Sequence, residues 1–484
     1  MLRIFRESGF RRITYKLNNK RSDYFSGMIR LFAILFFLAP LISFSQGFKV
    51  SIELTNSTDT VAYLGHHFAT NRYVDDTASV TNGKVEFSGS NSLTEGIYFY
   101  YSGSTYFEFL LVDQKLTIRA NAKDVPGTIQ FVSSDVNEGF YKLQNFTSER
   151  RAKSAELQNQ IKNETDQTKK EQITQELKDL NEEVLEFQAQ IRETYSNTLL
   201  DRMVRVMQNP EVPENPDIED QELYNYLYYK NHFWDGIDIA DPGLLRTPLL
   251  DPKVTDYLDN VVIQHPDSVI EAVDVIMQSA SKNSETFRYL LITLTNKYET
   301  SPLMGFDKVF VHLVENYYLN NKPEWVDAET LQKLSDRIAS IKPNFIGNPA
   351  PPLNLWDTLG TEVKLQDIKA QFTVLYFYDP DCGHCKTKTP LLYANYPELQ
   401  SRDVEILAIC TTTDEQRWLE FIKEHDLNWI NLADLQAKTY FKFYYDVRST
   451  PTVYILDKDK KILVKKIDAE QILPIIDDLI ARGD

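Results

Sequence analysis

Short runs of alternating apolar and polar residues dominate the first part of the chain after residue 46. Alternation with a period of two is typical of β-strands that bury one face. An Asn82-Gly83 pair separates two of these runs, and this dipeptide favours the tight turn of a hairpin. The runs are FKVSIEL, TVAYLGHH, GKVEFSG, GIYFYYSG and YFEFLLVDQKLTIRA. We therefore predict an antiparallel β-sandwich over residues 46–132, with a small barrel as the alternative.

From about Asp135 the apolar residues recur with the period of a helix. We predict a helical hairpin or coiled-coil segment over residues 133–210 that turns near residue 165, rather than one long helix with a polar middle. Its seam is expected to pack against its own partner helix in preference to forming a dimer, and the oligomeric state stays open. The seam residues follow the 4-3-4-3-4 spacing of a packed helical pair: Ile173, Leu177, Leu180, Val184, Phe187 and Ile191.

Three closely spaced prolines, at 210, 213 and 216, end this segment. Amphipathic stretches of helical spacing follow as far as residue 342, so most of their tyrosines and phenylalanines are expected in a core. We predict an all-α region over residues 211–342, in which the sequence indicates little chemistry.

The proline-rich loop KPNFIGNPAPPLNL marks a further boundary, so the last segment is taken as residues 343–484. Continuous apolar runs at 372–379 and 404–410 are typical of strands buried on both faces of a sheet. A helix-length stretch separates them, and another helix, a hairpin at 450–467 and a terminal helix follow. The order β-α-β-α-β-β-α predicts an α/β segment.

The N-terminus has the pattern of a secretory signal peptide. Residues 1–30 carry eight Lys or Arg against two acidic residues, and an apolar run of 14 residues follows at 31–44. That run is short against the ~20 residues of a membrane-spanning helix, so we predict a cleaved signal peptide over residues 1–45. Met28 is an alternative start. The mature protein is then exported to the periplasm or cell envelope.

Length and composition limit the other classes of function. A chain of 484 residues, 42% hydrophobic and 25% charged, is that of a globular protein with more than one domain. The net charge of −18 argues against nucleic acid or an anionic membrane surface as a partner.

The chain has three cysteines, and two of them, Cys382 and Cys385, form a CxxC pair after the first buried strand. Such a bridge closes too small a loop to stabilise an exported protein much. A zinc site needs four ligands, and the seven histidines have no suitable spacing, so no metal is expected. A redox couple is the interpretation that remains. Cys410, which ends the second apolar run, is expected to be a buried and unreactive thiol.

The C-terminal segment resembles the TlpA/ResA branch of the thioredoxin-like thiol-disulfide oxidoreductases. The resemblance rests on a CxxC pair at a strand-to-helix junction, a proline in the next helix, a Thr-Pro before a strand, and the lead-in APPLNLWDTLGTEVKLQDIKAQFTVLYFY. The upstream segments are similar to domains of unknown function that precede such thioredoxins in bacterial envelope proteins. The motif residues are Cys382-Gly383-His384-Cys385, Pro390 and Ser449-Thr450-Pro451-Thr452.

The position of the pair predicts the role of each cysteine. Cys382 would begin a helix, where free N–H groups and the helix dipole stabilise a thiolate, so it is the expected nucleophile. Cys385, one turn inside, is the expected resolving thiol, and Gly383 and His384 modulate the couple. The resemblance implies that Pro451 is cis and that the backbone of Thr450 pairs with an extended substrate segment. It implies no cofactor.

Two positions depart from the pattern of related proteins. Tyr376 stands where thioredoxins often bury a carboxylate, and Lys388 where ResA-type proteins carry a glutamate. The proton acceptor for Cys385 therefore stays open among Asp379, Asp381 and water. A peroxiredoxin is disfavoured, because only DPDC precedes the first cysteine and the proline and threonine of that family are missing.

The direction of electron flow is not decided by the sequence. The Gly-His dipeptide matches that of disulfide isomerases, whereas the TlpA/ResA resemblance implies a reductant recharged by a membrane donor. We favour reduction of protein disulfides in the cell envelope. The alternative is a binding or adaptor protein that keeps the scaffold and recruits an envelope partner through its β and helical domains.

Overall fold

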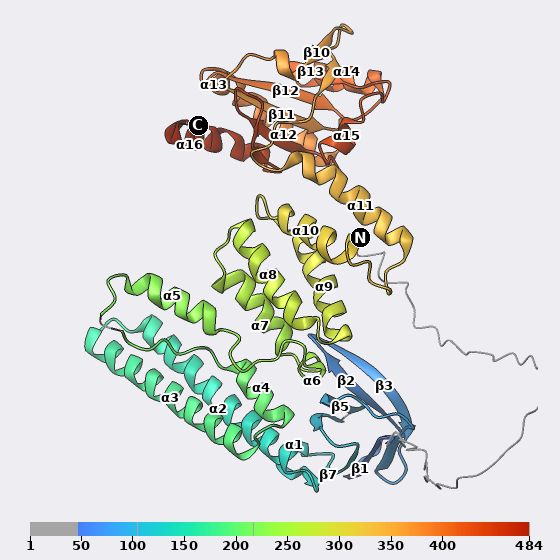
Figure 1. Cartoon of the computed structure of the whole chain (residues 1–484), viewed down its shortest axis with the longest axis vertical. Coiled ribbons are helices and arrows are strands. Elements are labelled where there is room, and N and C mark those ends of the chain that lie inside the picture. The colour runs from blue at the N-terminus through green and yellow to red at the C-terminus, as the bar shows by residue number, and fades with distance from the viewer. Residues whose placement is uncertain (1–46, 104, 216, 484) are drawn as a thin grey trace, which may run out of the picture. The chain divides into compact units, whose positions relative to one another are not determined.

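The computed structural model describes residues 47–103, 105–215 and 217–483, and Figure 1 shows its elements. Residues Gln46–Asp484 form one compact unit. The predicted signal peptide lies outside the described residues. Within the described part of the chain, no helix combines the length and the apolar character that crossing a membrane requires.

The first part of the chain is a sandwich of two four-stranded sheets, with the orders β4-β1-β7-β8 and β3-β2-β5-β6. Apolar side chains of both sheets, among them Ile52, Phe87, Phe109 and Ile118, form one core between them. The pairs are antiparallel except that β1 lies parallel to β7, an exception that the predicted antiparallel sandwich did not include. The strands are β1 Lys49–Thr55, β2 Val61–Phe68, β3 Asn71–Ser79, β4 Lys84–Ser88, β5 Gly96–Ser102, β6 Thr105–Leu111, β7 Lys115–Asn121 and β8 Gln130–Val132.

The Asn82-Gly83 turn forms, but it does not join two strands of one sheet. Both residues have positive φ, 52° and 73°, as a tight turn of this kind requires. Thr81 and Lys84 make the single bridge beside the turn. The strands that flank it, β3 and β4, belong to different sheets, so the predicted hairpin is a crossing between the layers.

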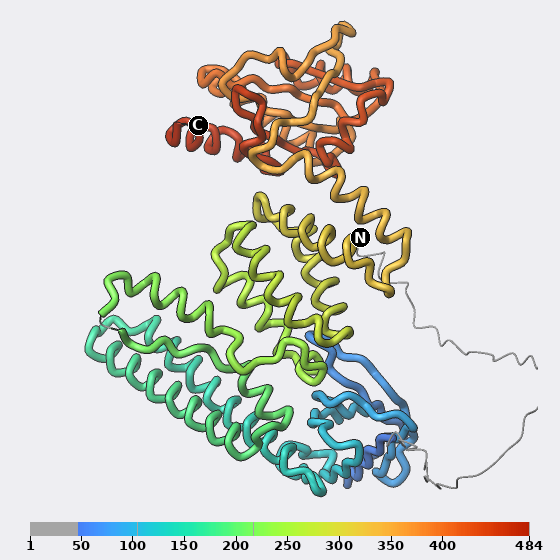
Figure 2. Tube along the Cα trace, viewed as in Figure 1, coloured from blue at the N-terminus to red at the C-terminus, as the bar shows by residue number. Residues whose placement is uncertain are grey.

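The predicted helical hairpin is present as α2 (Asp135–Asn163) and α3 (Gln167–Thr194), and Figure 2 shows the chain turning back between them. Asp166 caps α3 by accepting hydrogen bonds from the N–H groups of Thr168 and Lys169, at 3.0 and 3.1 Å. Phe187 of the seam stacks on Phe146 of α2 with ring centroids 4.0 Å apart. The seam therefore packs against its own partner helix, as expected.

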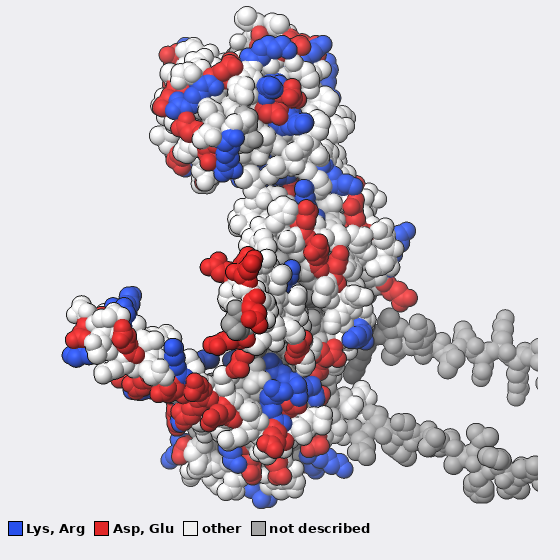
Figure 3. Space-filling view, turned by 60° about the vertical axis from the view of Figure 1, so that its left-hand side comes forward, with Lys and Arg blue, Asp and Glu red and all other residues white. Residues whose placement is uncertain are grey.

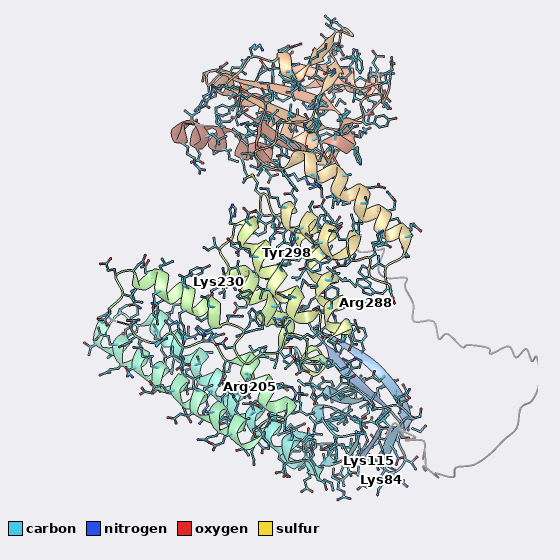
Figure 4. All side chains as sticks on the ribbon, viewed as in Figure 1. Lys84, Lys115, Arg205, Lys230, Arg288 and Tyr298 are labelled. Carbon is cyan, nitrogen blue, oxygen red and sulfur yellow. The ribbon has the colours of Figure 1, made fainter. Side chains whose placement is uncertain are left out.

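A helical region follows the hairpin, and its apolar core is continuous with buried residues of the sandwich and of the hairpin, among them Ile97 and Phe140. One exception to the expected aromatic core is α5, in which no residue is buried. Elsewhere aromatic rings pack as expected; Arg288, labelled in Figure 4, lies over the ring of Trp325 at 5.0 Å. The helices are α4 Leu199–Met207, α5 Gln221–His232, α6 Pro242–Leu245, α7 Leu250–Asp256, α8 Pro266–Ala280, α9 Ser284–Glu299, α10 Asp307–Leu313 and α11 Ala328–Ile341, with π-helical turns at Tyr257–Val261 and Val314–Leu319.

The C-terminal segment is a seven-stranded sheet of order β10-β9-β13-β12-β11-β14-β15 with helices packed on it. All seven residues of β11 are buried, because separate apolar clusters cover the two faces of the sheet. The strands are β9 Asn354–Trp356, β10 Glu362–Lys364, β11 Phe372–Tyr378, β12 Val404–Cys410, β13 Ile430–Ala433, β14 Thr452–Leu456 and β15 Ile462–Lys465. The helices are α12 Gly383–Ala394, α13 Tyr396–Gln400, α14 Glu415–Glu424, α15 Phe441–Tyr444 and α16 Ile472–Arg482.

The pattern of the sequence did not include β13, which pairs with β12 and β9 inside this sheet. The strand has only four residues, too few for a clear period. Otherwise β11, β12, β14 and β15 lie where the apolar runs placed them. Acidic and basic side chains are both spread over the face of the molecule drawn in Figure 3.

Candidate active site

The two cysteines of the CxxC pair lie at the junction of β11 and α12. Cys382 is the residue that precedes α12, and its carbonyl accepts a hydrogen bond from the N–H of Lys386 at 3.1 Å. Its side chain is half-buried, whereas that of Cys385, one turn further, is fully buried. The two thiols are free, so the described site is a dithiol with one accessible sulfur.

The surroundings of Cys382 favour its thiolate. Burial by itself would raise the pKa of this thiol, because it disfavours the charged form. Hydrogen bonds from the side chain of Thr450, from the backbone and side chain of Cys385 and from the backbone N–H of His384 have the opposite effect and together outweigh burial. The pKa of Cys382 is therefore held below its ordinary value, as expected for a thiol at a helix N-terminus.

Cys385 has the opposite character. Burial raises the pKa of its thiol to about 12, although the backbone N–H of Asp379 acts to lower it. That N–H group lies 3.5 Å from the sulfur. An accessible sulfur with a lowered pKa next to a buried one with a raised pKa is the arrangement expected of an attacking and a resolving thiol.

Thr450 and Pro451 come to the same place from a distant part of the chain. The peptide bond between them is cis. The carbonyl oxygen of Thr450 accepts a hydrogen bond from the thiol of Cys382 at 3.1 Å, across 68 residues of sequence. The structure thus brings together Cys382, Cys385 and the Thr-Pro pair, while Gly383 and His384 are exposed at the first turn of α12.

Tyr376 and Lys388, the two residues that depart from the family pattern, contact other side chains. The hydroxyl of Tyr376 lies 2.9 Å from that of Thr389, and burial raises the pKa of this tyrosine. Lys388 forms an ion pair with Glu470 at 2.6 Å, so its charge is partly compensated. Neither side chain is suited to accept the proton of Cys385 at neutral pH.

Of the two open acidic residues, Asp379 contacts Cys385, through its backbone N–H. Asp381 forms an ion pair with Arg417 of α14. The carboxylate of Asp379 accepts a hydrogen bond from the hydroxyl of Thr411 at 3.2 Å, a contact that no motif in the sequence indicated. Thr411 follows β12 directly, and this position at the end of a strand is the feature of the sequence that could have indicated a contact with the site.

The third cysteine lies outside this pair. Cys410 ends β12 and is buried, and burial raises the pKa of its thiol to about 12. This is the buried thiol that the sequence predicted. Among the described residues, no group of three or more His, Cys, Asp or Glu side chains is arranged to hold a metal ion.

Comparisons with known proteins agree with this geometry. Residues 346–465 match the model of the AhpC/TSA family. Over 117 residues the chain is 27% identical to the thiol-disulfide oxidoreductase ResA of Bacillus subtilis. The aligned stretch covers 24% of this chain and 64% of ResA. The C-terminal segment is a thioredoxin-like domain that is similar to thiol-disulfide oxidoreductases. The chain spans less than two thirds of the length of the curated relatives it matches.

Two further similarities concern this thioredoxin-like domain and its surroundings. The chain is 31% identical over 94 residues to the peroxiredoxin Bcp of Bacillus subtilis. The aligned stretch covers 19% of this chain and 59% of that protein. A crystal structure of a thioredoxin-like protein from Bacteroides caccae matches with a TM-score of 0.47 and 21% identity, over 56% of this chain and 99% of that one.

The region ahead of the thioredoxin-like domain also matches a known model. Residues 159–344 match a domain of unknown function, DUF5106. The match begins inside α2 and ends at Asn344, just before the thioredoxin-like domain. The predicted likeness to domains of unknown function is confirmed for the helical part of the upstream region, and for the β-sandwich it stays a prediction.

Proposed function

We propose that this protein is an exported thiol-disulfide oxidoreductase that exchanges disulfides with proteins of the cell envelope through Cys382 and Cys385. The observation that carries the proposal is the asymmetry of the pair. Cys382 is accessible and has a lowered pKa, whereas Cys385 is buried and its pKa is raised to about 12. Such a pair attacks with one sulfur and resolves with the other.

In the reducing direction, the thiolate of Cys382 attacks one sulfur of a substrate disulfide. A mixed disulfide forms, and the other substrate sulfur leaves as a thiolate. Cys385 then loses its proton and attacks the sulfur of Cys382, which releases the second substrate thiol and leaves a Cys382–Cys385 disulfide. Two electrons pass to the substrate, so the cycle needs a dithiol donor, which we assign to a membrane protein.

Thr450 supplies the binding element of this reaction. Because it is only half-buried and contacts Cys382, its backbone lies where an extended substrate segment would run beside the reacting sulfur. Main-chain pairing of this kind recognises many sequences, since it uses the backbone rather than particular side chains. Export rests on the predicted signal peptide over residues 1–45, and cell fractionation tests it directly.

The first experiment traps the substrate. In the full mature chain, Cys385→Ala should accumulate mixed disulfides on Cys382 in envelope extracts, because the resolving thiol is missing. Cys382→Ala should accumulate few, since the remaining thiol is buried. Cys410→Ala is the matched control. Added to Cys385→Ala, it should leave the yield of mixed disulfides unchanged. Equal trapping by Cys382→Ala and Cys385→Ala would contradict the assignment of roles.

The second experiment separates the reaction classes and the direction. The parent protein should reduce insulin disulfides with a dithiol donor and should not turn over hydrogen peroxide, as a peroxiredoxin would. Equilibration with a glutathione redox series gives the potential, for which a reductant lies nearer to thioredoxin, about −270 mV, than to disulfide isomerase, about −180 mV. Turnover of hydrogen peroxide without reduction of insulin would contradict the proposed function and indicate a peroxidase instead.

A further inference from the structure

Asp446 occupies a special place in the thioredoxin-like domain. It lies five residues before Pro451, in the segment that runs from α15 to β14 and carries Thr450 to Cys382. Its side chain is only 3% exposed, and its backbone has φ of +47°, in the left-handed region. A buried carboxylate must be paired, since desolvation of an unpaired charge is costly.

The partner of Asp446 comes from the helical region that precedes the thioredoxin-like domain. Arg337 of α11 donates from Nη1 to the Asp446 carboxylate, and its own side chain is only 6% exposed. Ser340, one turn further along the same helix, donates to the same carboxylate at 3.4 Å. Asn344, just after the helix, donates to the carbonyl oxygen of Tyr444 at 2.6 Å. Three side chains in and just after α11 thus hold Asp446 and the last residue of α15, Tyr444.

The remaining contacts of Asp446 lie inside the thioredoxin-like domain. Lys466 donates to its other carboxylate oxygen at 2.7 Å, and the backbone N–H of Lys466 donates to the carbonyl of Val453 at 2.7 Å. Arg448 also donates to Asp446 at 3.2 Å, but its side chain is 61% exposed. Asp446 therefore links α11 to the end of the segment that enters β14.

We propose that Arg337 is a positioning residue for disulfide exchange: its ion pair with Asp446 fixes the segment that presents Thr450 to Cys382. The inference rests on the proposed function of the CxxC pair. The segment between Asp446 and Pro451 is short, so a shift of about 1 Å at its anchored end would move Thr450 out of hydrogen-bonding distance of Cys382. The side chain of Thr450 is a group whose hydrogen bond lowers the pKa of Cys382, so its displacement should raise that pKa. The helical region then takes part in setting the reactivity of Cys382 without touching it.

The surroundings of Arg337 allow its side chain to be replaced by a shorter, uncharged one. Its Nε donates to Glu299 at 3.2 Å, and a cavity of about 110 Å³ lies beside the network, lined by Tyr298, Glu299 and Arg337 among others. Tyr298 is labelled in Figure 4. Because water can enter such a polar cavity, the carboxylates left by a shortened side chain can be solvated. We therefore expect Arg337→Met to fold.

The test measures the reactivity of Cys382 in the full mature chain. In Arg337→Met, the midpoint of the pH profile of Cys382 alkylation should rise, and the rate at pH 7 should fall by about three- to tenfold, half to one pH unit in the profile. Arg337→Lys should recover part of the rate, because an ammonium restores the charge but cannot donate to Glu299 and Asp446 with the geometry of a guanidinium. Lys333→Met, on the exposed side of the same helix, is the control and should match the parent.

A double variant separates positioning from a direct effect of charge. Arg337→Met with Asp446→Asn removes both charges of the pair, so a purely electrostatic effect would be cancelled and the parent profile restored. Under our inference the segment stays unanchored, and the rate stays low. Restoration in the double variant overturns the inference, as does a parent-like profile in a folded Arg337→Met. If the parent protein itself shows an unreactive Cys382 and no insulin reduction, the proposed function fails instead.

Discussion

Cys382 and Cys385 lie three residues apart in one helix turn, yet their thiols have opposite acidities. The pKa of Cys382 is lowered because hydrogen bonds from the side chain of Thr450 and from the start of α12 outweigh the effect of burial. The pKa of Cys385 is raised to about 12 because burial outweighs the hydrogen bonds from the backbone N–H of Asp379 and from the side chain of Thr450. The acidity of each thiol is therefore decided by its burial and its hydrogen bonds together, not by the residue type.

This difference predicts selective alkylation. Iodoacetamide reacts with thiolates, so at pH 7 it should modify Cys382 and leave Cys385 and Cys410 unmodified in the folded protein. The rate at Cys382 should rise through a midpoint below the ~8.5 of a free cysteine. Peptide mass spectrometry after timed quenching gives the rate at each site. A rate at Cys382 that stays flat in pH until about 8 would contradict the lowered pKa.

At the scale of elements, the helical hairpin shows how much a period in the sequence decides. The seam of α3 faces α2, and Phe187 stacks on Phe146, whose ring also lies under the guanidinium of Arg150 at 4.1 Å. Such an aromatic pair adds to the burial of area alone. The hairpin therefore has a stabilising contact near its middle, between two long helices with few buried residues.

Phe187→Ala should weaken this hairpin locally. We expect a loss of about 1–3 kcal/mol, below that of a fully buried phenylalanine, because the side chain is only half-buried. Hydrogen exchange should show lower protection for the amides of α2 and α3, with little change in β11. Leu185→Ala, on an exposed side of the same helix, is the matched control. Equal loss of protection in both variants would show that the seam does not hold the hairpin.

At the scale of the whole molecule, buried charges join the helical region to the thioredoxin-like domain. Asp446 meets Arg337, and Lys465 meets Asp307 of α10. A buried ion pair contributes little net stability, but breaking one by removing a single partner costs about 3–5 kcal/mol. The boundary predicted near residues 343–353 therefore separates two stretches of sequence that share polar contacts in the folded chain.

This network predicts an acid-sensitive stability. Burial would raise the pKa of Asp446, but Lys466 and Arg337 lower it further than burial raises it. A carboxyl with a depressed pKa contributes stability above its unfolded pKa of ~3.9, and this stability is lost as the pH falls through the folded pKa. Asp446→Asn should therefore lower the urea midpoint strongly at pH 7 and less at pH 3, where the parent also begins to lose the charge.

The control for this prediction is Asp478→Asn, which removes an exposed pair with Arg482. Exposed pairs contribute about 0–1 kcal/mol, so this variant should unfold close to the parent at both values of pH. A difference between Asp446→Asn and the parent that stays constant from pH 7 to pH 3 would mean that the charge of Asp446 is not what stabilises the junction.

The sequence alone determined what depends on neighbouring residues. The period of two over residues 46–132, the seam of α3 and the CxxC pair at the start of α12 are local patterns, and each reports the element that forms there. The roles predicted for Cys382 and Cys385 rest on their order along one helix.

Only the tertiary structure decided what depends on residues far apart. The parallel pairing of β1 with β7, the short strand β13 and the crossing at Asn82-Gly83 are set by how sheets pair, which a short window does not contain. The contact between Cys382 and Thr450 spans 68 residues, and that between Arg337 and Asp446 spans 109. Hydrogen bonds and buried charges need a partner at one distance and direction, and that partner is chosen by the packing of the whole chain.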